Sequence, residues 1–463
     1  MNRLSAISPI DGRYSKTSEP LVDIFSEKGL MRYRIIVEGE YLIALSKLNL
    51  KLRKITEKEQ KIIRALYNLS DADAQIISDI EWKGYKNIKA TDHDVKAVEY
   101  YLKDKLGGTT LKDVLEWIHF GLTSEDTNNL SYALMIQDGV EVILKKLTEV
   151  QKEIEILVKA NAKLPMLSRT HGQSASPTTF GKEFKVFHAR IERQLKELRS
   201  KHILAKLNGA TGNYNAHISA YPKTDWIKFT KTFVSDLNKL NSKTIKLEAN
   251  LFTTQIESHD SNIEIFDCIR RINTILIDFD QDMWRYISDE WIVQKQVEGA
   301  VGSSTMPHKT NPIKFENSEG NLGLANSLFE FFARKLPISR LQRDLTDSTV
   351  QRNYGTAFAH SFIAYEYLLK GLSRISINEN KVVEALNNHP EVIAEAIQTV
   401  LRREGAPMPY EQLKALTKGR KVTLKDFEEF IQGLQVSETV KKELKKFTPE
   451  NYIGIAEVLA KIK

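Results

Sequence analysis

The longest patterned stretches of the chain predict helices. From Glu125 to Ala162 there is no proline and only one glycine, Gly139, which predicts a single long helix. Between Pro222 and Gly299 neither proline nor glycine occurs. We therefore expect a fold that is built mainly from long helices.

The second of these stretches carries the apolar seam of a helical bundle. Its apolar side chains recur with alternating steps of four and three, at Ile265, Ile269, Ile272, Leu276, Phe279, Met283 and Tyr286. A helix from Asp260 to about Val297 spans roughly 55 Å, longer than a small domain is wide. It is also apolar off the seam, at Ile263, Phe266, Ile275, Ile277, Trp284 and Ile287. We expect neighbouring chains to cover part of it, which predicts an oligomeric bundle.

Polar segments rich in helix breakers separate the long helices. They are residues 163–181 and 208–222, both too polar for a core, and residues 302–321, with a new helix from about Phe315. These patterns predict an all-α fold with three helical domains. The expected domains are residues 1–119, a central long-helix bundle of residues 120–375 that includes the 302–312 segment, and residues 376–463.

Composition narrows the class of protein. Of 463 residues, 41% are apolar and 27% charged, which is ordinary for a globular chain. The one cysteine, Cys268, excludes an intramolecular disulfide and a multi-thiolate metal site, and it suits a reducing compartment. No uncharged apolar run reaches membrane-spanning length. We expect a cytoplasmic protein with no metal and no membrane contact.

The net charge of +7 is compatible with several kinds of binding partner. Lysine is spread along the chain, which suits a solvated surface, a small polyanionic substrate or nucleic acid. No DNA- or RNA-binding signature accompanies the charge. We therefore expect no nucleic-acid partner.

Candidate chemistry lies in polar segments beside the predicted helices. In "SPIDGRY" (8–14), Asp11 and Gly12 form a turn that presents Arg13 and Tyr14, although an ordinary turn explains the segment equally well.

Two further segments stand at helix starts. In 91–102, Asp92, His93 and Asp94 precede a helix whose amides favour an anion. In 120–129, Thr123 and Ser124 lie at the start of the long helix. All of these residues can also serve as simple helix caps.

The last two segments offer acid–base chemistry. His171, in 168–177, can change protonation near neutral pH, although a lone loop histidine is more often ordinary surface. The segment 302–312 combines the hydroxyls of Ser303 and Ser304 with Lys309 and Asn311, which suggests a lid that closes over an anionic substrate.

The same segment resembles a known signature. "GSSTMPHKTNP" (302–312) is similar to the signature of the fumarase, aspartase and argininosuccinate lyase superfamily, and His308 favours its adenylosuccinate lyase branch. Similarity to the bacterial form of that branch extends along nearly the whole chain, through "SPIDGRY", "TDHDVKAVEYYL", "SRTHGQ", "TTQIESHD" and "RDLTDSTVQRN". The lysine-rich segment 238–250 is longer than the family pattern.

The resemblance implies an activity and a site. It implies elimination of fumarate from adenylosuccinate, giving AMP, and from succinylaminoimidazole carboxamide ribotide (SAICAR), giving AICAR, without a cofactor. Ser303 is the implied base and His171 the implied acid, with Ser303 preferred to Ser304 by motif position alone. The implied substrate-binding residues are Arg13, Tyr14, Asp92, His93, Asp94, Thr123, Ser124, Gln255, Lys309, Asn311, Arg343, Ser348 and Arg352. It also implies a homotetramer whose active sites are each shared by three subunits.

Three alternatives remain at this point. A sister enzyme such as argininosuccinate lyase uses the same elimination on a substrate without a nucleotide phosphate. An inactive structural homologue would keep the fold alone, which the joint presence of Ser303, Lys309, Asn311 and His171 argues against. A nucleic-acid-binding helical protein would bind with strong salt dependence.

Overall fold

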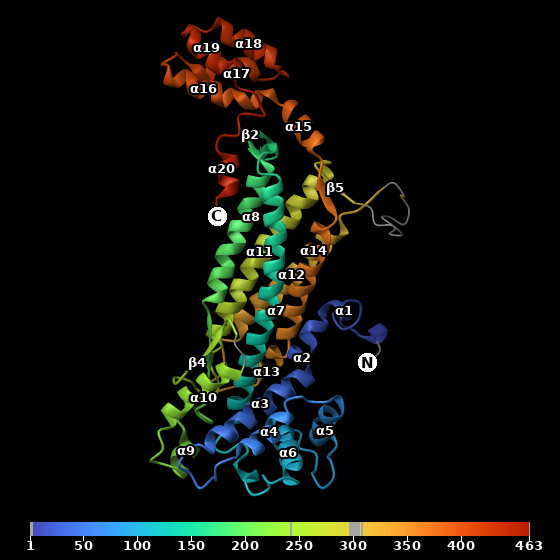
Figure 1. Ribbon diagram of the computed structural model, residues 1–463, viewed down its shortest axis with the longest axis vertical. Coiled ribbons are helices and arrows are strands. Elements are labelled where there is room, and N and C mark those ends of the chain that lie inside the picture. The colour runs from blue at the N-terminus through green and yellow to red at the C-terminus, as the bar shows by residue number, and fades with distance from the viewer. Residues whose placement is uncertain (1–2, 241–242, 296–305, 307–308, 463) are drawn as a thin grey trace. The chain divides into compact units, whose positions relative to one another are not determined.

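The computed structural model describes residues 3–240, 243–295, 306 and 309–462 (Figure 1). The chain forms two compact units. Unit 1 comprises Met1–Leu147, Arg193–Thr274 and Gly320–Glu366, and unit 2 comprises Thr148–Glu192, Ile275–Glu319 and Tyr367–Lys463. Several long helices contribute residues to both units.

The structure is helical, with a few short strands. The α-helices are α1 (Ser15–Ser18), α2 (Val22–Phe25), α3 (Glu27–Leu45), α4 (Glu57–Ala65), α5 (Asp71–Trp82), α6 (Asp94–Gly107), α7 (Ser124–Ala160), α8 (Phe180–Arg199), α9 (Asn215–Ala220), α10 (Trp226–Leu240), α11 (Asp260–Ser288), α12 (Ile313–Lys335), α13 (Thr346–Gln351), α14 (Tyr354–Leu372), α15 (Glu379–Asn387), α16 (Ala394–Arg403), α17 (Pro409–Thr417), α18 (Leu424–Gly433), α19 (Glu438–Leu444) and α20 (Ala456–Lys461). The strands are β1 (Pro165–Thr170), β2 (Gln173–Thr179), β3 (His202–Ala205), β4 (Lys246–Ala249), β5 (Ile292–Gln294) and β6 (Ile375–Ile377), paired as β1–β2, β3–β4 and β5–β6. The predicted all-α class is confirmed.

The long helix predicted between residues 125 and 162 is confirmed as α7. Its one glycine has a packing reason. A Cβ on Gly139 would lie 2.5 Å from the ring of Phe25, and a Cβ on Gly355 of α14 would lie 2.5 Å from the Cβ of Phe25. The Phe25 ring, in α2, also lies 4.8 Å from that of Phe358. Absence of side chains at both glycines therefore lets α2 pack closely in unit 1.

The seam helix is α11, and most of its predicted seam is buried. Six of the seven seam positions, all except the half-buried Tyr286, are at most 1% exposed. Off the seam, Phe266 and Ile275 are buried as well, whereas Trp284 is 46% exposed. The predicted burial on more than one face is thus present over the first part of the helix.

The prediction that this helix continues to about Val297 is wrong, because α11 ends at Ser288. Glu290 adopts the left-handed conformation with φ of 59°. The amides of Glu290 and Trp291 donate to the carbonyls of Ile287 and Tyr286, and the Trp291 and Tyr286 rings stack. This is a Schellman ending, in which glycine usually supplies the left-handed residue. Because glutamate occupies that position here, the sequence contains no glycine that would mark the end of the helix.

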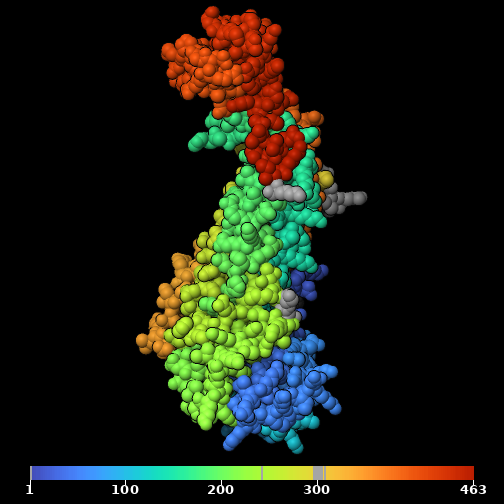
Figure 2. Space-filling model, turned by 60° about the vertical axis from the view of Figure 1, so that its left-hand side comes forward, coloured from blue at the N-terminus to red at the C-terminus, as the bar shows by residue number. Residues whose placement is uncertain are grey.

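Unit 1 surrounds the start of α7 with short helices and a small parallel sheet. Helix α3 packs against α4, α5, α6 and α10, and β3 pairs in parallel with β4. Figure 2 shows the yellow-green segment of residues near 200–250 beside the blue N-terminal helices. The predicted polar segment 208–222 is partly wrong, because Asn208 and His217 are buried and residues 215–220 form α9.

Unit 2 contains a hairpin where a polar loop was expected. Residues 165–179 form the antiparallel pair β1–β2, with Met166 and Leu167 buried. His171 and Gly172 occupy its two-residue turn with φ of 54° and 74°. Two successive positive φ values are those of the tight hairpin turn that suits right-handed strand twist.

Among the described residues of unit 2, the remaining regular elements are helices and the β5–β6 pair. Helix α12 begins at Ile313, close to its predicted start. None of the helices in the described part of the chain is long and apolar enough to cross a membrane. The three predicted domains and their boundaries stay a prediction.

Candidate active site

Two arginines in unit 1 share one carboxylate. Arg34 Nη2 and Arg352 Nη2 each lie 2.7 Å from Asp94 Oδ2. Arg34 is buried in α3, and its Nε also donates to Asn128 Oδ1 at 2.9 Å. Burial opposes ionisation of Asp94, but the two guanidinium groups outweigh it and hold the pKa of that carboxyl below its usual range. The first residue of α6 thus ties three distant segments together.

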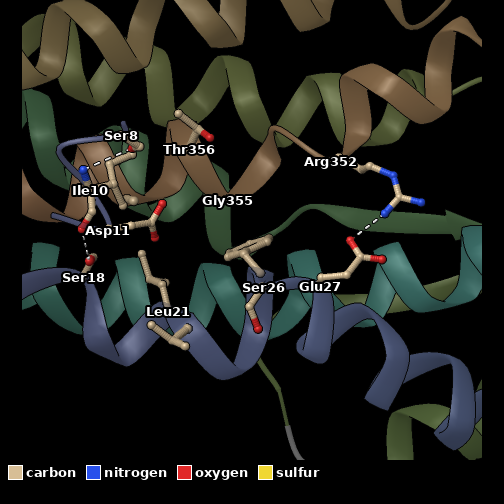
Figure 3. A pocket seen from close by; sticks show the side chains of 13 residues that line it. Ser8, Ile10, Asp11, Ser18, Leu21, Ser26, Glu27, Arg352, Gly355 and Thr356 are labelled. Carbon is tan, nitrogen blue, oxygen red and sulfur yellow. Dashed lines mark hydrogen bonds and ion pairs between the residues drawn. The ribbon is translucent and has the colours of Figure 1, made fainter. Parts of the chain in front are cut away.

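Arg352 also borders a cavity. Its Nη1 lies 2.6 Å from Glu27 Oε2, at the start of α3. The cavity, of about 400 Å³, is lined by Ser8 and Asp11 of the "SPIDGRY" segment together with Glu27 and Arg352 (Figure 3). Two of the sequence-predicted segments therefore meet at one hollow in unit 1.

His93 faces the start of α7. Its Nδ1 accepts the backbone N–H of Lys96 at 3.2 Å, which caps α6. In a neutral ring this leaves the proton on Nε2, which lies 3.4 Å from Ser124 Oγ. The imidazole therefore presents an N–H donor beside the hydroxyl, an arrangement that can bind an anion.

A buried ion pair fixes the adjacent backbone. Lys206 Nζ lies 2.6 Å from Asp126 Oδ1, and both side chains are 0% exposed. The other Asp126 oxygen accepts the N–H of Thr123 at 2.9 Å, and the amides of Asn208 and Gly209 also donate to this carboxylate. This network of buried, paired groups therefore fixes the backbone position of Thr123.

Arg343 joins α7 to the segment before α11. Its Nη2 lies 3.0 Å from Glu125 Oε2, and its Nη1 lies 3.5 Å from Gln255 Oε1. The backbone N–H of Gln255 donates to the carbonyl of Gln342 at 3.3 Å. Two residues predicted from separate segments are thus brought together.

Glu125 belongs to a buried charged cluster. Burial raises its pKa to about 7, with Arg343 opposing the rise and Asp347 adding to it. Asp347 Oδ2 lies 3.9 Å from His259 Nε2, and both residues are buried. Glu125 thus lies in a dry environment in which its charge depends on a few neighbours.

The remaining predicted residues of unit 1 lie at its surface or partly within it. Arg13 and Asp92 are exposed, the latter with φ of 47°, and Tyr14 is half-buried. Ser348, in α13, is half-buried, and its N–H donates to Asp347 Oδ1 at 2.7 Å.

Of the predicted catalytic pair, the structure describes only His171, which belongs to unit 2. His171 is exposed at the tip of the hairpin. Lys309 is exposed and Asn311 half-buried in the segment before α12. Ser303 and His308 lie outside the described residues. Among the described residues, no group of three or more histidine, cysteine and acidic side chains is arranged to hold a metal ion.

The sequence analysis did not predict the buried residues that hold the site residues in position. Arg34 stands in the apolar run of α3, and a charged residue in such a run was a readable signal. Glu125 and Lys206 carried no comparable signal, because their partners lie at positions 343 and 126 in the chain.

Comparisons with known proteins indicate the family and the fold of the chain. The family model described as Lyase matches residues 12–325, and the model described as Adenylosuccinate lyase C-terminal matches residues 339–453. In fold, the chain resembles a fumarate lyase from Mesorhizobium sp. BNC1, with a TM-score of 0.74, 17% identity and 96% of each chain covered. It also resembles a 3-carboxy-cis,cis-muconate lactonizing enzyme from Pseudomonas putida, with a TM-score of 0.71 and 18% identity over 95% of this chain and 94% of that one. The Lyase model covers more than half of the chain, which therefore belongs to that lyase family, and the two solved structures show that it shares their fold.

Sequence similarity narrows the class. The chain is 48% identical to an adenylosuccinate lyase of Haemophilus influenzae and 47% identical to one of Escherichia coli, with 98% of each chain covered in both comparisons. It is also 48% identical to an adenylosuccinate lyase of Dictyostelium discoideum, over 98% of this chain and 97% of that protein. The chain belongs to the adenylosuccinate lyase family.

Proposed function

We propose that this protein eliminates fumarate from adenylosuccinate, giving AMP, and from SAICAR, giving AICAR. The observation that carries the proposal is the 47–48% identity to adenylosuccinate lyases along 98% of the chain. The motif "GSSTMPHKTNP" at residues 302–312 supports it, because a lyase needs those groups for proton removal and carboxylate binding.

The reaction needs a base, an acid and a site for a dianion. In the proposal, the Ser303 alkoxide removes the proton from the carbon next to a carboxylate. The C–N bond then breaks, and His171 gives a proton to the departing nitrogen. Lys309 and Asn311 stabilise the carboxylate as negative charge develops on it. A serine hydroxyl is a weak base at neutral pH, so Ser303 must act as an alkoxide, and the positive charge of Lys309 stabilises that alkoxide.

The residues of unit 1 supply the rest of the site. Thr123, Ser124 and Gln255 hold the succinyl carboxylates. The nucleoside and phosphate are bound by Arg13, Tyr14, His93, Arg343, Ser348 and Arg352. Asp92 and Asp94 complete the proposed substrate-binding residues. Arg352, whose side chain is 37% exposed, and the Nε2–H of His93 support this assignment, because a guanidinium and an imidazole N–H are donors that suit a phosphate.

The proposal includes a homotetramer whose active sites each draw on three subunits. The proposal places the enzyme in the cytoplasm, which the buried, unpaired Cys268 suits.

A direct assay tests the function. Purified protein is mixed with adenylosuccinate, and the change in ultraviolet absorbance and the release of fumarate and AMP are followed. Argininosuccinate serves as the matched control, since it undergoes the same elimination without a nucleotide phosphate. Turnover of adenylosuccinate alone is the expected result. Turnover of argininosuccinate alone, or of neither, contradicts the proposal.

A further inference from the structure

The cluster around Arg343 contains an acid that the proposed chemistry does not use. Glu125 is 1% exposed, so its carboxylate has no surface from which to touch a substrate. Arg343, its partner at 3.0 Å, retains 13% exposure and reaches Gln255 with Nη1 at 3.5 Å. Any effect of Glu125 on the reaction must therefore pass through the arginine.

An arginine side chain needs such a partner in order to keep one direction. It has many rotamers when free, and ordering it costs conformational entropy at the moment a ligand binds. A buried carboxylate that is already paired with one edge of the guanidinium removes that cost beforehand. The other edge, with Nη1, is then directed toward Gln255.

The backbone gives Glu125 a fixed place. It lies in the first turn of α7, directly after Thr123 and Ser124, where the helix amides favour a negative charge. The same turn is anchored by the buried pair of Asp126 and Lys206. The Glu125–Arg343 ion pair therefore begins at a helix turn whose position is fixed by a second, fully buried ion pair.

A second buried acid, Asp347, lies near Glu125 and contributes to the raised pKa of Glu125. Asp347 faces His259, whose backbone is in the left-handed region with φ of 64° and whose N–H donates to Glu257 Oε2 at 2.7 Å. Gln351 Nε2 lies 3.2 Å from His259 Nε2. A non-glycine residue in this conformation costs free energy and persists where the surroundings require it.

Three buried polar atoms belong to the cluster around Arg343. Glu125 Oε1, Arg343 Nε and Asp347 Oδ2 are buried without a hydrogen-bond partner among the described residues. Each such group reduces stability and calls for an explanation, and a functional role is one explanation. Their concentration around one arginine marks this cluster as more than a structural ion pair.

We propose that Glu125 is a positioning residue of the elimination reaction, which holds Arg343 so that Nη1 faces Gln255 and the anionic substrate. The inference rests on the proposed function, because Arg343 is assigned to the nucleotide there. Glu125 acts on substrate affinity and not on the proton transfers.

The test compares steady-state kinetics with adenylosuccinate for the wild type and Glu125→Gln above pH 7, where the Glu125 carboxyl is mostly ionised. The substitution keeps the shape of the side chain and removes its charge. We expect KM to rise by about tenfold, with kcat changed by less than about threefold. Glu40→Gln is the matched control, because Glu40 is also a buried partner of an arginine, Arg64 at 2.7 Å, outside the site. Its KM should equal that of the wild type.

A double-mutant cycle shows whether the effect passes through Arg343. If it does, Glu125→Gln adds little to the KM of Arg343→Ala, whereas independent effects would multiply. If Glu125→Gln does not fold, as judged by circular dichroism, Glu125→Asp takes its place with the same expected rise in KM.

The outcomes separate this inference from the proposed function. An inactive wild type refutes the function. An active wild type with an unchanged KM in the folded Glu125 variant overturns the inference, as do a loss confined to kcat and multiplicative effects in the cycle.

Discussion

Lys206 and Asp126 form an ion pair in which neither side chain is exposed, with Nζ 2.6 Å from Oδ1. Lys206 Nζ also donates to the carbonyl of Gly209 at 2.7 Å. Because the carboxylate receives several backbone amides as well, this pair joins the start of α7 to the turn after β3. It thereby places Thr123 and Ser124.

We predict that Lys206→Met strongly destabilises the protein. The substitution leaves a buried carboxylate without its cation, which typically costs about 3 to 5 kcal/mol. The free energy of unfolding in urea is the measurement. Lys239→Met is the control, because Lys239 makes a similarly short pair of 2.7 Å, with Asp236, at the surface, where such pairs contribute below about 1 kcal/mol. Equal losses in the two variants would contradict the prediction.

Asp94 should make stability sensitive to acid. Its folded pKa lies below 3.8, so its ionised form stabilises the fold at higher pH, and that contribution is lost as the pH falls below 3.8. We predict that Asp94→Asn is less stable than the wild type at pH 7 and that the difference shrinks on acidification. Urea unfolding at a series of pH values measures it. A difference that is constant with pH would refute the assignment.

Glu125 should act in the opposite direction. Its folded pKa of about 7 exceeds its ordinary value of 4.5, so its contribution is full below pH 4.5 and is lost as the pH rises to about 7. We predict that the wild type loses stability relative to Glu125→Gln over this range. The same urea series detects it, and an advantage of the wild type that grows with pH would contradict it.

Gly121 should tolerate no side chain. Its φ is 72°, and a Cβ would lie 2.9 Å from the ring of the buried His217. Gly405 has a similar φ of 70° but open space around it. Gly405→Ala should therefore cost only backbone strain of about 1 kcal/mol, and Gly121→Ala clearly more. Thermal unfolding of the two variants tests the difference, and equal losses would show that the contact with His217 yields freely.

Long helices could be read from the sequence because their signal is local. The absence of breakers predicted α7, and the spacing of apolar residues predicted the buried face of α11. The end of α11 could not be read, because Glu290 takes the left-handed position that glycine usually marks. The hairpin at His171 was missed for a related reason, since histidine precedes Gly172 in its turn.

The supporting groups of the site could not be read, because their partners are distant in the chain. Asp94 with Arg352, and Glu125 with Arg343, are brought together only by folding. Single polar residues at helix starts predicted which segments contribute to the site. Which charged residues pair across those segments could be seen only in the structure. The catalytic roles of Ser303 and His171 stay a prediction.

The most direct test of the account is complementation between subunits. Ser303→Ala and His171→Ala are each expected to be inactive alone. After mixing under conditions in which exchange of subunits is verified with differently tagged chains, sites that draw these residues from different subunits should recover up to about a quarter of the wild-type activity. No recovery after verified exchange would contradict a site that combines Ser303 and His171 from different copies of the chain.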